Sequence, residues 1–127
     1  MPSRNEVYQC KHCGNIVEVL HGGKAPLICC GEPMKLLREG ETDGAMEKHV
    51  PVIEKKCGEI KVSVGSVMHP ATEEHYIEWV LLVSDNGYQL KYVPVGQEAV
   101  VSFRLGKGEK LEAVYAYCNL HGLWKAD

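Results

Sequence analysis

Hydrophobic and polar residues alternate along much of the second half of the chain, as in strands that bury one face. Residues 60–64 (Ile-Lys-Val-Ser-Val) alternate strictly with a period of two, which predicts a half-buried strand. Residues 76–83 are almost continuously apolar and contain Trp79, as expected for an inner strand. Three further strand-like segments cover residues 88–95, 98–105 and 110–117. No segment shows a convincing helical period.

Turn residues separate these strand-like segments. Asp85-Asn86-Gly87 is a strong hairpin signal between two of them. Gly106-Lys107-Gly108 separates the last two. Several short strands with turns at this spacing predict an all-β sandwich.

The first quarter of the chain has a different character. It holds four of the six cysteines, with short strand-like pieces at residues 6–8 and 15–20. A stretch this short rarely buries a self-sufficient core, so a metal there would be required for folding. Residues 37–48 are polar and contain glycine, and we expect them to form a linker. The predicted domains are residues 1–37 and 38–127.

Composition narrows the class of protein and its location. Of the 127 residues, 45% are hydrophobic and 24% charged, and no apolar run approaches a membrane span of about 20 residues. The N-terminus lacks the apolar region of a signal peptide. We therefore expect a cytoplasmic protein, in which clustered cysteines favour metal binding over disulfides. With a net charge of -3 and scattered Lys and Arg, the chain has no nucleic-acid-binding signature.

The four cysteines of the first quarter have the spacing of a metal site. Cys10 and Cys13 form a C-x2-C pair, and Cys29 and Cys30 follow after fifteen residues. Neighbouring side chains of a strand point to opposite faces. The adjacent pair can therefore reach one ion only through a sharp turn, which Gly31 would allow. Zinc and iron both accept four thiolates, so both stay open, and a Cys29–Cys30 disulfide is disfavoured in a reducing compartment.

A second set of potential metal ligands combines imidazoles with one thiol. Its members are His49, His69, His75, Cys118 and His121. Five donors exceed the tetrahedral habit of zinc, and imidazole with thiolate suits iron, copper, nickel or zinc. Four imidazoles in a plane with an axial thiolate would leave a sixth position open. A divalent ion there carries a net charge of +1, which attracts small anions, whereas four thiolates give a net charge of -2, which repels them.

Two other functions compete with an enzyme. A β-sandwich ending in Cys118-x2-His121 also fits a blue-copper electron carrier, but such a site usually has an axial methionine soon after the histidine. None of the four methionines follows His121. A structural zinc knuckle on a protein-binding sandwich would leave four histidines without a shared role.

Taken together, these motifs resemble those of desulfoferrodoxin, the two-iron form of superoxide reductase. The resemblance covers essentially the whole chain and preserves both the order and the separation of the two sites. The residues that carry it are Cys10-x2-Cys13, Cys29-Cys30, Glu47-Lys48-His49-Val50-Pro51, His69-Pro70, His75-Tyr76, Cys118-Asn119-Leu120-His121-Gly122 and Trp124-Lys125.

The resemblance implies two iron ions per chain and one enzymatic activity. A desulforedoxin-like, rubredoxin-type domain (1–37) would bind iron through Cys10, Cys13, Cys29 and Cys30. An immunoglobulin-like β-sandwich (38–127) would bind a second iron through His49, His69, His75 and His121 in the equatorial plane and Cys118 on the axis. This second iron would reduce superoxide to hydrogen peroxide with electrons from rubredoxin or a similar donor. Family members are typically homodimers.

Two charged residues beside the first histidine ligand gain a role only from this resemblance. The ammonium of Lys48 is expected above the iron, where it would attract the anion and steer a proton or a water. Glu47 is implied to cap the oxidised iron after the product has left. Without the resemblance, both would be solvated linker charges. Cys57 has no role in the pattern and is expected to be a free thiol near a turn.

Overall fold

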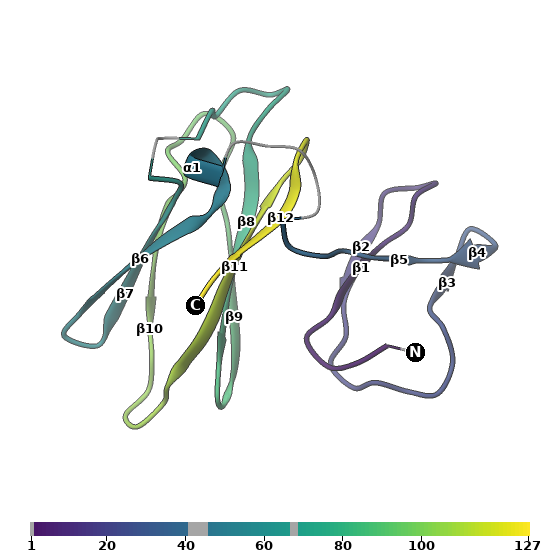
Figure 1. Cartoon of the computed structure of the whole chain (residues 1–127), viewed down its shortest axis with the longest axis horizontal. Coiled ribbons are helices and arrows are strands. Elements are labelled where there is room, and N and C mark those ends of the chain that lie inside the picture. Colours follow the sequence, from purple (N-terminus) through teal and green to yellow (C-terminus); the bar gives the residue numbers. More distant parts are fainter. Residues whose placement is uncertain (1, 41–45, 67–68) are drawn as a thin grey trace. The chain divides into compact units, whose positions relative to one another are not determined.

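The computed structural model describes residues 2–40, 46–66 and 69–127. The chain divides into two compact units, Met1–Arg38 and Glu39–Asp127, which we call the first and second unit (Figure 1). Nearly all of the regular secondary structure in both units is β-strand. No helix in the described ranges has the length and apolar character needed to cross a membrane.

The second unit is a sandwich of two antiparallel sheets (Figure 1). One sheet has the strand order β10-β7-β6 and consists of β6 (Pro51–Lys56), β7 (Glu59–Val64) and β10 (Val100–Arg104). The other has the order β12-β11-β8-β9 and consists of β8 (Ile77–Ser84), β9 (Gly87–Tyr92), β11 (Leu111–Cys118) and β12 (Gly122–Ala126). Lettered in chain order as A, B, C, C′, E, F and G, these strands form the immunoglobulin sheets ABE and GFCC′. The predicted all-β, immunoglobulin-like class is confirmed.

The core of the second unit lies between its two sheets. Inward positions of β7 pack against those of β8 and β11, and Val62, Val80 and Val114 are fully buried there. Burying each such side chain stabilises the fold by about 1.5–3 kcal/mol. The strict alternation of residues 60–64 therefore reflects one face on this core and one face outside it.

Three elements of the second unit were not predicted. The strands β6 and β12 lie at sheet edges, and β6 is exposed along its last three residues, so its hydrophobic pattern is weak. A single-turn helix, α1 (Met46–His49), occupies part of the expected linker, so the linker prediction was wrong there. Residues 41–45 of that linker lie outside the described ranges.

The first unit has little core of its own. A three-stranded sheet has the order β2-β1-β5, and its members are β1 (Val7–Gln9), β2 (Ile16–Glu18) and β5 (Lys35–Leu36). A separate hairpin joins β3 (Ile28–Cys29) to β4 (Glu32–Pro33). The buried residues among those described in this unit are Pro2, Val7, Cys10 and Val19. So few buried side chains agree with the expectation that this unit needs a metal to fold.

Candidate metal centres

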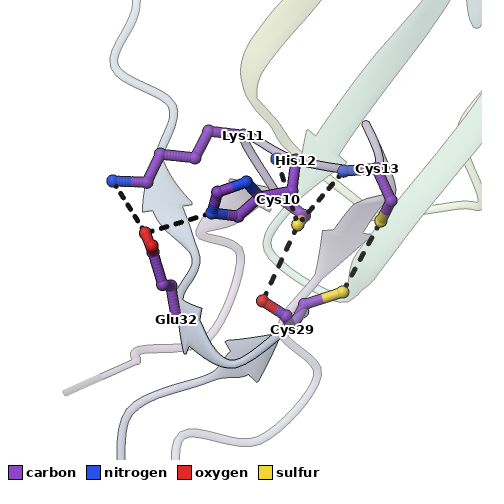
Figure 2. Close-up of polar contacts among 6 residues, drawn as sticks. All are labelled: Cys10, Lys11, His12, Cys13, Cys29 and Glu32. Atoms are coloured by element: carbon purple, nitrogen blue, oxygen red, sulfur yellow. Dashed lines mark hydrogen bonds and ion pairs between the residues drawn. The ribbon is translucent and has the colours of Figure 1, made fainter.

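The four cysteines of the first unit converge on one point, which we call the first centre. Cys10 and Cys13 flank the turn after β1, Cys29 ends β3, and Cys30 follows it. Their sulfur atoms all lie within 4.8 Å of one another, and Cys13 Sγ is 3.6 Å from Cys29 Sγ (Figure 2). Four sulfurs bound at about 2.3 Å to one tetrahedral ion would lie about 3.8 Å apart. The thiols therefore fit a closed four-coordinate metal.

A tight hairpin turn lets the adjacent cysteines share this centre. Cys29 pairs with Glu32 across the hairpin, which leaves Cys30 and Gly31 as the two turn residues. Both have positive φ, 52° and 78°, as in a type I′ turn. The left-handed conformation costs a non-glycine residue about 1–2 kcal/mol, and here it brings Cys30 back toward the other thiols. The sharp turn predicted at Gly31 is confirmed.

Backbone amides and an acidic side chain organise the first centre. The N–H groups of Cys13 and His12 point at Cys10 Sγ, at 3.5 and 3.4 Å, and these bonds lower the pKa of Cys10 to about 6. Cys10 therefore favours the thiolate that binds metal. Glu32 Oε2 accepts from Lys11 Nζ at 3.1 Å and from His12 Nε2 at 3.2 Å, which ties the C-x2-C turn to β4 (Figure 2).

Four imidazoles form a closed cycle in the second unit, at what we call the second centre. Ring centroids are 4.7 Å apart for His49 and His69, 4.6 Å for His69 and His75, 4.9 Å for His75 and His121, and 4.8 Å for His121 and His49. Neighbouring rings meet at 74° to 82°. Across the cycle, His49 and His75 are 6.0 Å apart and nearly parallel. Such a cycle can surround a single ion.

Ring nitrogens without protein partners point to what the cycle is built to bind. His69 Nδ1 lies 2.7 Å from the carbonyl oxygen of Pro70. Because a carbonyl only accepts, Nδ1 carries the proton of the neutral ring, and Nε2 has a free lone pair. The Nε2 atoms of His69 and His75 are buried and have no hydrogen-bond partner. Burial lowers the pKa of His69 to about 4, so this ring stays neutral at pH 7. A neutral imidazole with an orphaned acceptor, oriented by a carbonyl as in His69, is typical of a metal ligand.

A buried thiol completes the donor set. Cys118, at the end of β11, has no exposed surface, and its Sγ lies 3.9 Å from His121 Nδ1. The ligand atoms of Cys118, His49, His75 and His121 lie within 4.8 Å of one another. His69 joins this group through its ring contacts with His49 and His75.

The Cys118 thiol sits in an environment that suits it to a metal. Burial raises its pKa, while hydrogen bonds from the backbone of His121 and Leu120 lower it. A bound cation would add to the effect of these bonds and hold the sulfur as thiolate. The five donors therefore fit a metal that accepts both imidazole and thiolate.

Two residues without an assigned role support this cycle. The Trp124 ring stacks on His49, with centroids 4.9 Å apart, and its Nε1–H donates to the carbonyl oxygen of His121 at 3.0 Å. Asn119 hydrogen-bonds on both sides of His75. Both residues lie in the motifs on which the resemblance rests, but the sequence alone did not indicate that either one supports the histidines.

The remaining candidates occupy different environments. Lys48 is partly buried on α1, and its positive charge adds to burial and to His121 in lowering the pKa of His75. The charge of Lys48 therefore acts on a histidine of the second centre. The side chain of Glu47 lies outside what the structure describes. Cys57 is an exposed free thiol in the β6–β7 turn, as expected.

Comparison with known proteins identifies the family. Residues 41–127 match the family model for desulfoferrodoxin, and residues 2–37 match the model for its N-terminal domain. The chain is 55% identical to the desulfoferrodoxin of Nitratidesulfovibrio vulgaris, over 100% of this chain and 99% of the relative. It is 38% identical to the superoxide reductase of Thermococcus kodakarensis, over 70% of this chain and 90% of the relative.

A solved structure agrees with these relatives over the full length. The crystal structure of the superoxide reductase from Treponema pallidum superposes with a TM-score of 0.82 at 35% identity, covering 100% of both chains. The resemblance inferred from the motifs is thereby confirmed. This chain belongs to the desulfoferrodoxin family.

Proposed function

We propose that this chain is a superoxide reductase, which converts superoxide to hydrogen peroxide with one electron and two protons at the second centre. The cycle of four imidazoles beside a buried thiol carries this proposal, because five donors would leave a six-coordinate ion one position for substrate. Both donor sets match the two-iron architecture of desulfoferrodoxin and superoxide reductase. The activity named for the relatives is consistent with this site.

The residues of the second centre have distinct tasks. We propose that the side chains of His49, His69, His75, His121 and Cys118 would hold the iron. When bound, ferrous iron supplies the electron. Neutral imidazoles and one thiolate leave a divalent ion with a net charge of +1, which favours an anionic substrate. His49, His69 and Cys118 are buried, whereas His75 and His121 are partly exposed, so a small anion can approach from their side.

Two charged residues are proposed to handle the anion and its protons. The Lys48 ammonium attracts superoxide and holds a proton or a water beside the reacting oxygen. Its electrostatic effect on His75 supports this position. Glu47 is proposed, on the resemblance alone, to close the site after the product leaves.

A stoichiometric measurement tests the activity directly. Iron-loaded, reduced protein is mixed with superoxide, and both the superoxide consumed and the hydrogen peroxide formed are counted. A reductase gives one peroxide for each superoxide and consumes one electron of the donor. A dismutase gives one peroxide for two superoxides and releases oxygen. The second ratio, or no reaction at all, would overturn the proposal.

The two units are proposed to divide the work, with residues 1–37 holding an auxiliary iron and residues 38–127 the reacting one. A rubredoxin-like protein would supply the electrons. We also propose a cytoplasmic location, because a reducing compartment keeps the clustered thiols available for metal. The six cysteines are free in the structure.

Changing Cys13 to serine tests this division. The variant should lose the iron of the first centre, because three thiolates and a hydroxyl no longer match the site. Superoxide reduction at the second centre should persist at close to the wild-type rate constant. Iron content and the rate of superoxide decay measure the two effects. If the rate collapsed while the second centre was fully loaded, the first iron would be essential rather than auxiliary.

We propose a homodimer in which a second copy covers the apolar surface of the first unit. A pocket of about 550 Å³ lies on this unit. Leu20 and Ile28 line it and are 62% and 57% exposed. A unit with so small a core gains most from burying such surface in a partner.

A charge placed at this surface tests the dimer. Ile28→Glu should shift the iron-loaded protein from twice the chain mass of 14.1 kDa toward a single chain, because a carboxylate is costly to bury. Sedimentation velocity measures the mass. Tyr92→Glu, at a 73%-exposed residue of the second unit, is the control and should leave the mass unchanged. A wild-type protein that sediments as a single chain would contradict the proposal.

A further inference from the structure

The Asn119 side chain joins two segments that each carry a ligand of the second centre. Its Oδ1 accepts a hydrogen bond from the N–H of Tyr76 at 2.9 Å, and its Nδ2 donates to the carbonyl oxygen of Glu74 at 3.0 Å. The Asn119 backbone N–H donates to the carbonyl oxygen of Tyr76 at 3.2 Å. Three bonds therefore hold the backbone on both sides of His75 to the residue that follows Cys118.

These bonds continue the sheet beyond the point where its ladder ends. The pairing of β8 with β11 is regular from Val83 and Ala113 to Trp79 and Tyr117, then shifts register and ends at Ile77 and Cys118. Beyond Ile77 the chain leaves the strand, and the backbone around Tyr76 no longer has a ladder partner. The Asn119 carboxamide supplies such a partner in place of a strand, because it carries one acceptor and one donor.

Local contacts alone do not fix His75 to the sandwich. Its backbone bonds to Thr72, within the same loop: the Thr72 N–H donates to the His75 carbonyl oxygen at 3.0 Å, and the His75 N–H donates to the Thr72 carbonyl oxygen at 3.2 Å. The Thr72 hydroxyl adds further bonds to His75. This turn shapes the loop but spans only four residues. Asn119, more than forty residues away in sequence, connects the loop to β11.

The chemistry of this position selects asparagine. Among short side chains, a carboxamide offers an acceptor and a donor at once, whereas a carboxylate offers acceptors alone. An aspartate would keep the bond from the Tyr76 N–H but would face the Glu74 carbonyl with a second acceptor. Alanine would lose both side-chain bonds and retain the backbone bond.

We propose that Asn119 is a positioning residue of the second centre, which fixes the His75 imidazole relative to the Cys118 sulfur. The inference rests on the proposed function only in assigning His75 and Cys118 as ligands of one ion. Outer residues that orient metal ligands typically change metal affinity by about 10–100-fold when they are replaced. The same effect is expected here, because a freed His75 loop can carry its ring away from the ion.

The test compares iron loss from the two centres of the full-length, iron-loaded chain. Asn119→Ala should release the iron of the second centre to a chelator about tenfold faster or more. It should also shift the visible absorption band between the Cys118 sulfur and the iron. Asn119→Asp should fall between alanine and wild type. The first centre serves as the internal reference and should keep its rate, since the three Asn119 hydrogen bonds described above lie within the second unit.

A matched control separates positioning from general stability. Gln89 also uses a carboxamide to bond a distant carbonyl, that of Arg104 at 2.8 Å, but in a part of the sandwich without ligands. Gln89→Ala should leave iron release and the visible band unchanged, and thermal unfolding shows how far each variant loses stability. Asn119→Ala with wild-type iron release and spectrum, or Gln89→Ala with equally fast release, would overturn the proposal. Superoxide reduction by the wild-type chain is measured separately, so that a failure of the function is distinguishable from a failure of this inference.

Discussion

Replacing Cys118 with serine is expected to abolish superoxide reduction and to remove the visible absorption of the second centre. The buried thiolate is the only sulfur of the proposed ligand set, so the sulfur-to-iron band depends on it. A serine hydroxyl is a harder donor than a thiolate and carries no negative charge at neutral pH. It therefore replaces the sulfur poorly in this position. The loss in rate constant should exceed a hundredfold. Stopped-flow measurements with superoxide and the spectrum of the oxidised protein check the two effects.

A second thiol provides the control for this experiment. Cys57→Ser changes an exposed cysteine in the β6–β7 turn, outside both donor sets. This variant should retain both visible bands and the full rate. The first centre should also keep its spectrum in Cys118→Ser, because its four thiols lie in the other unit. A Cys118→Ser protein that keeps the band of the second centre would remove Cys118 from the ligand set.

Replacing Lys48 with isoleucine is expected to slow the reaction with superoxide by about tenfold or more, with both irons in place. Steering by charge raises association rates by about 10–10³-fold. The positive charge of Lys48 contributes to lowering the pKa of His75, after burial and His121. The wild-type rate should fall as salt is added, because ions screen this attraction. The variant should show a weaker dependence on salt.

A lysine elsewhere in the same unit tests whether position or net charge matters. Lys56 ends β6, about 17 Å along the strand from Pro51, and Pro51 follows the proposed ligand His49 closely in sequence. Lys56→Ile removes the same charge and should leave the rate nearly unchanged. Equal slowing in both variants would assign the effect to the net charge of the chain. An unchanged rate in Lys48→Ile would remove Lys48 from the mechanism.

Strong local patterns made most of the sandwich predictable. The strict alternation at residues 60–64 and the apolar run at 76–83 lie within one residue of β7 and β8. Each pattern arises because a strand with one or both faces buried needs apolar side chains at fixed intervals. The edge strands β6 and β12, the two-residue strands of the first unit and helix α1 carry too little of any period to be predicted.

The candidate ligands were also accessible from sequence, for a different reason. Thiol and imidazole are chemically distinctive, and C-x2-C with a second cysteine pair is rare by chance. Gly31 indicated the sharp turn that the left-handed Cys30 confirms. The spacing of the four cysteines did not decide between zinc and iron, in contrast, because both metals accept four thiolates.

By itself, the sequence determined which side chains can bind metal, that they fall into two sets, and that the second set belongs to a β-sandwich. Only the tertiary structure decided the order of the rings in the imidazole cycle and the tasks of Trp124 and Asn119. The physical reason is that side-chain chemistry and strand periodicity are local properties. Contacts between residues tens of positions apart, such as Asn119 with the His75 loop, exist only once distant strands have paired and the segments that follow them have met at one end.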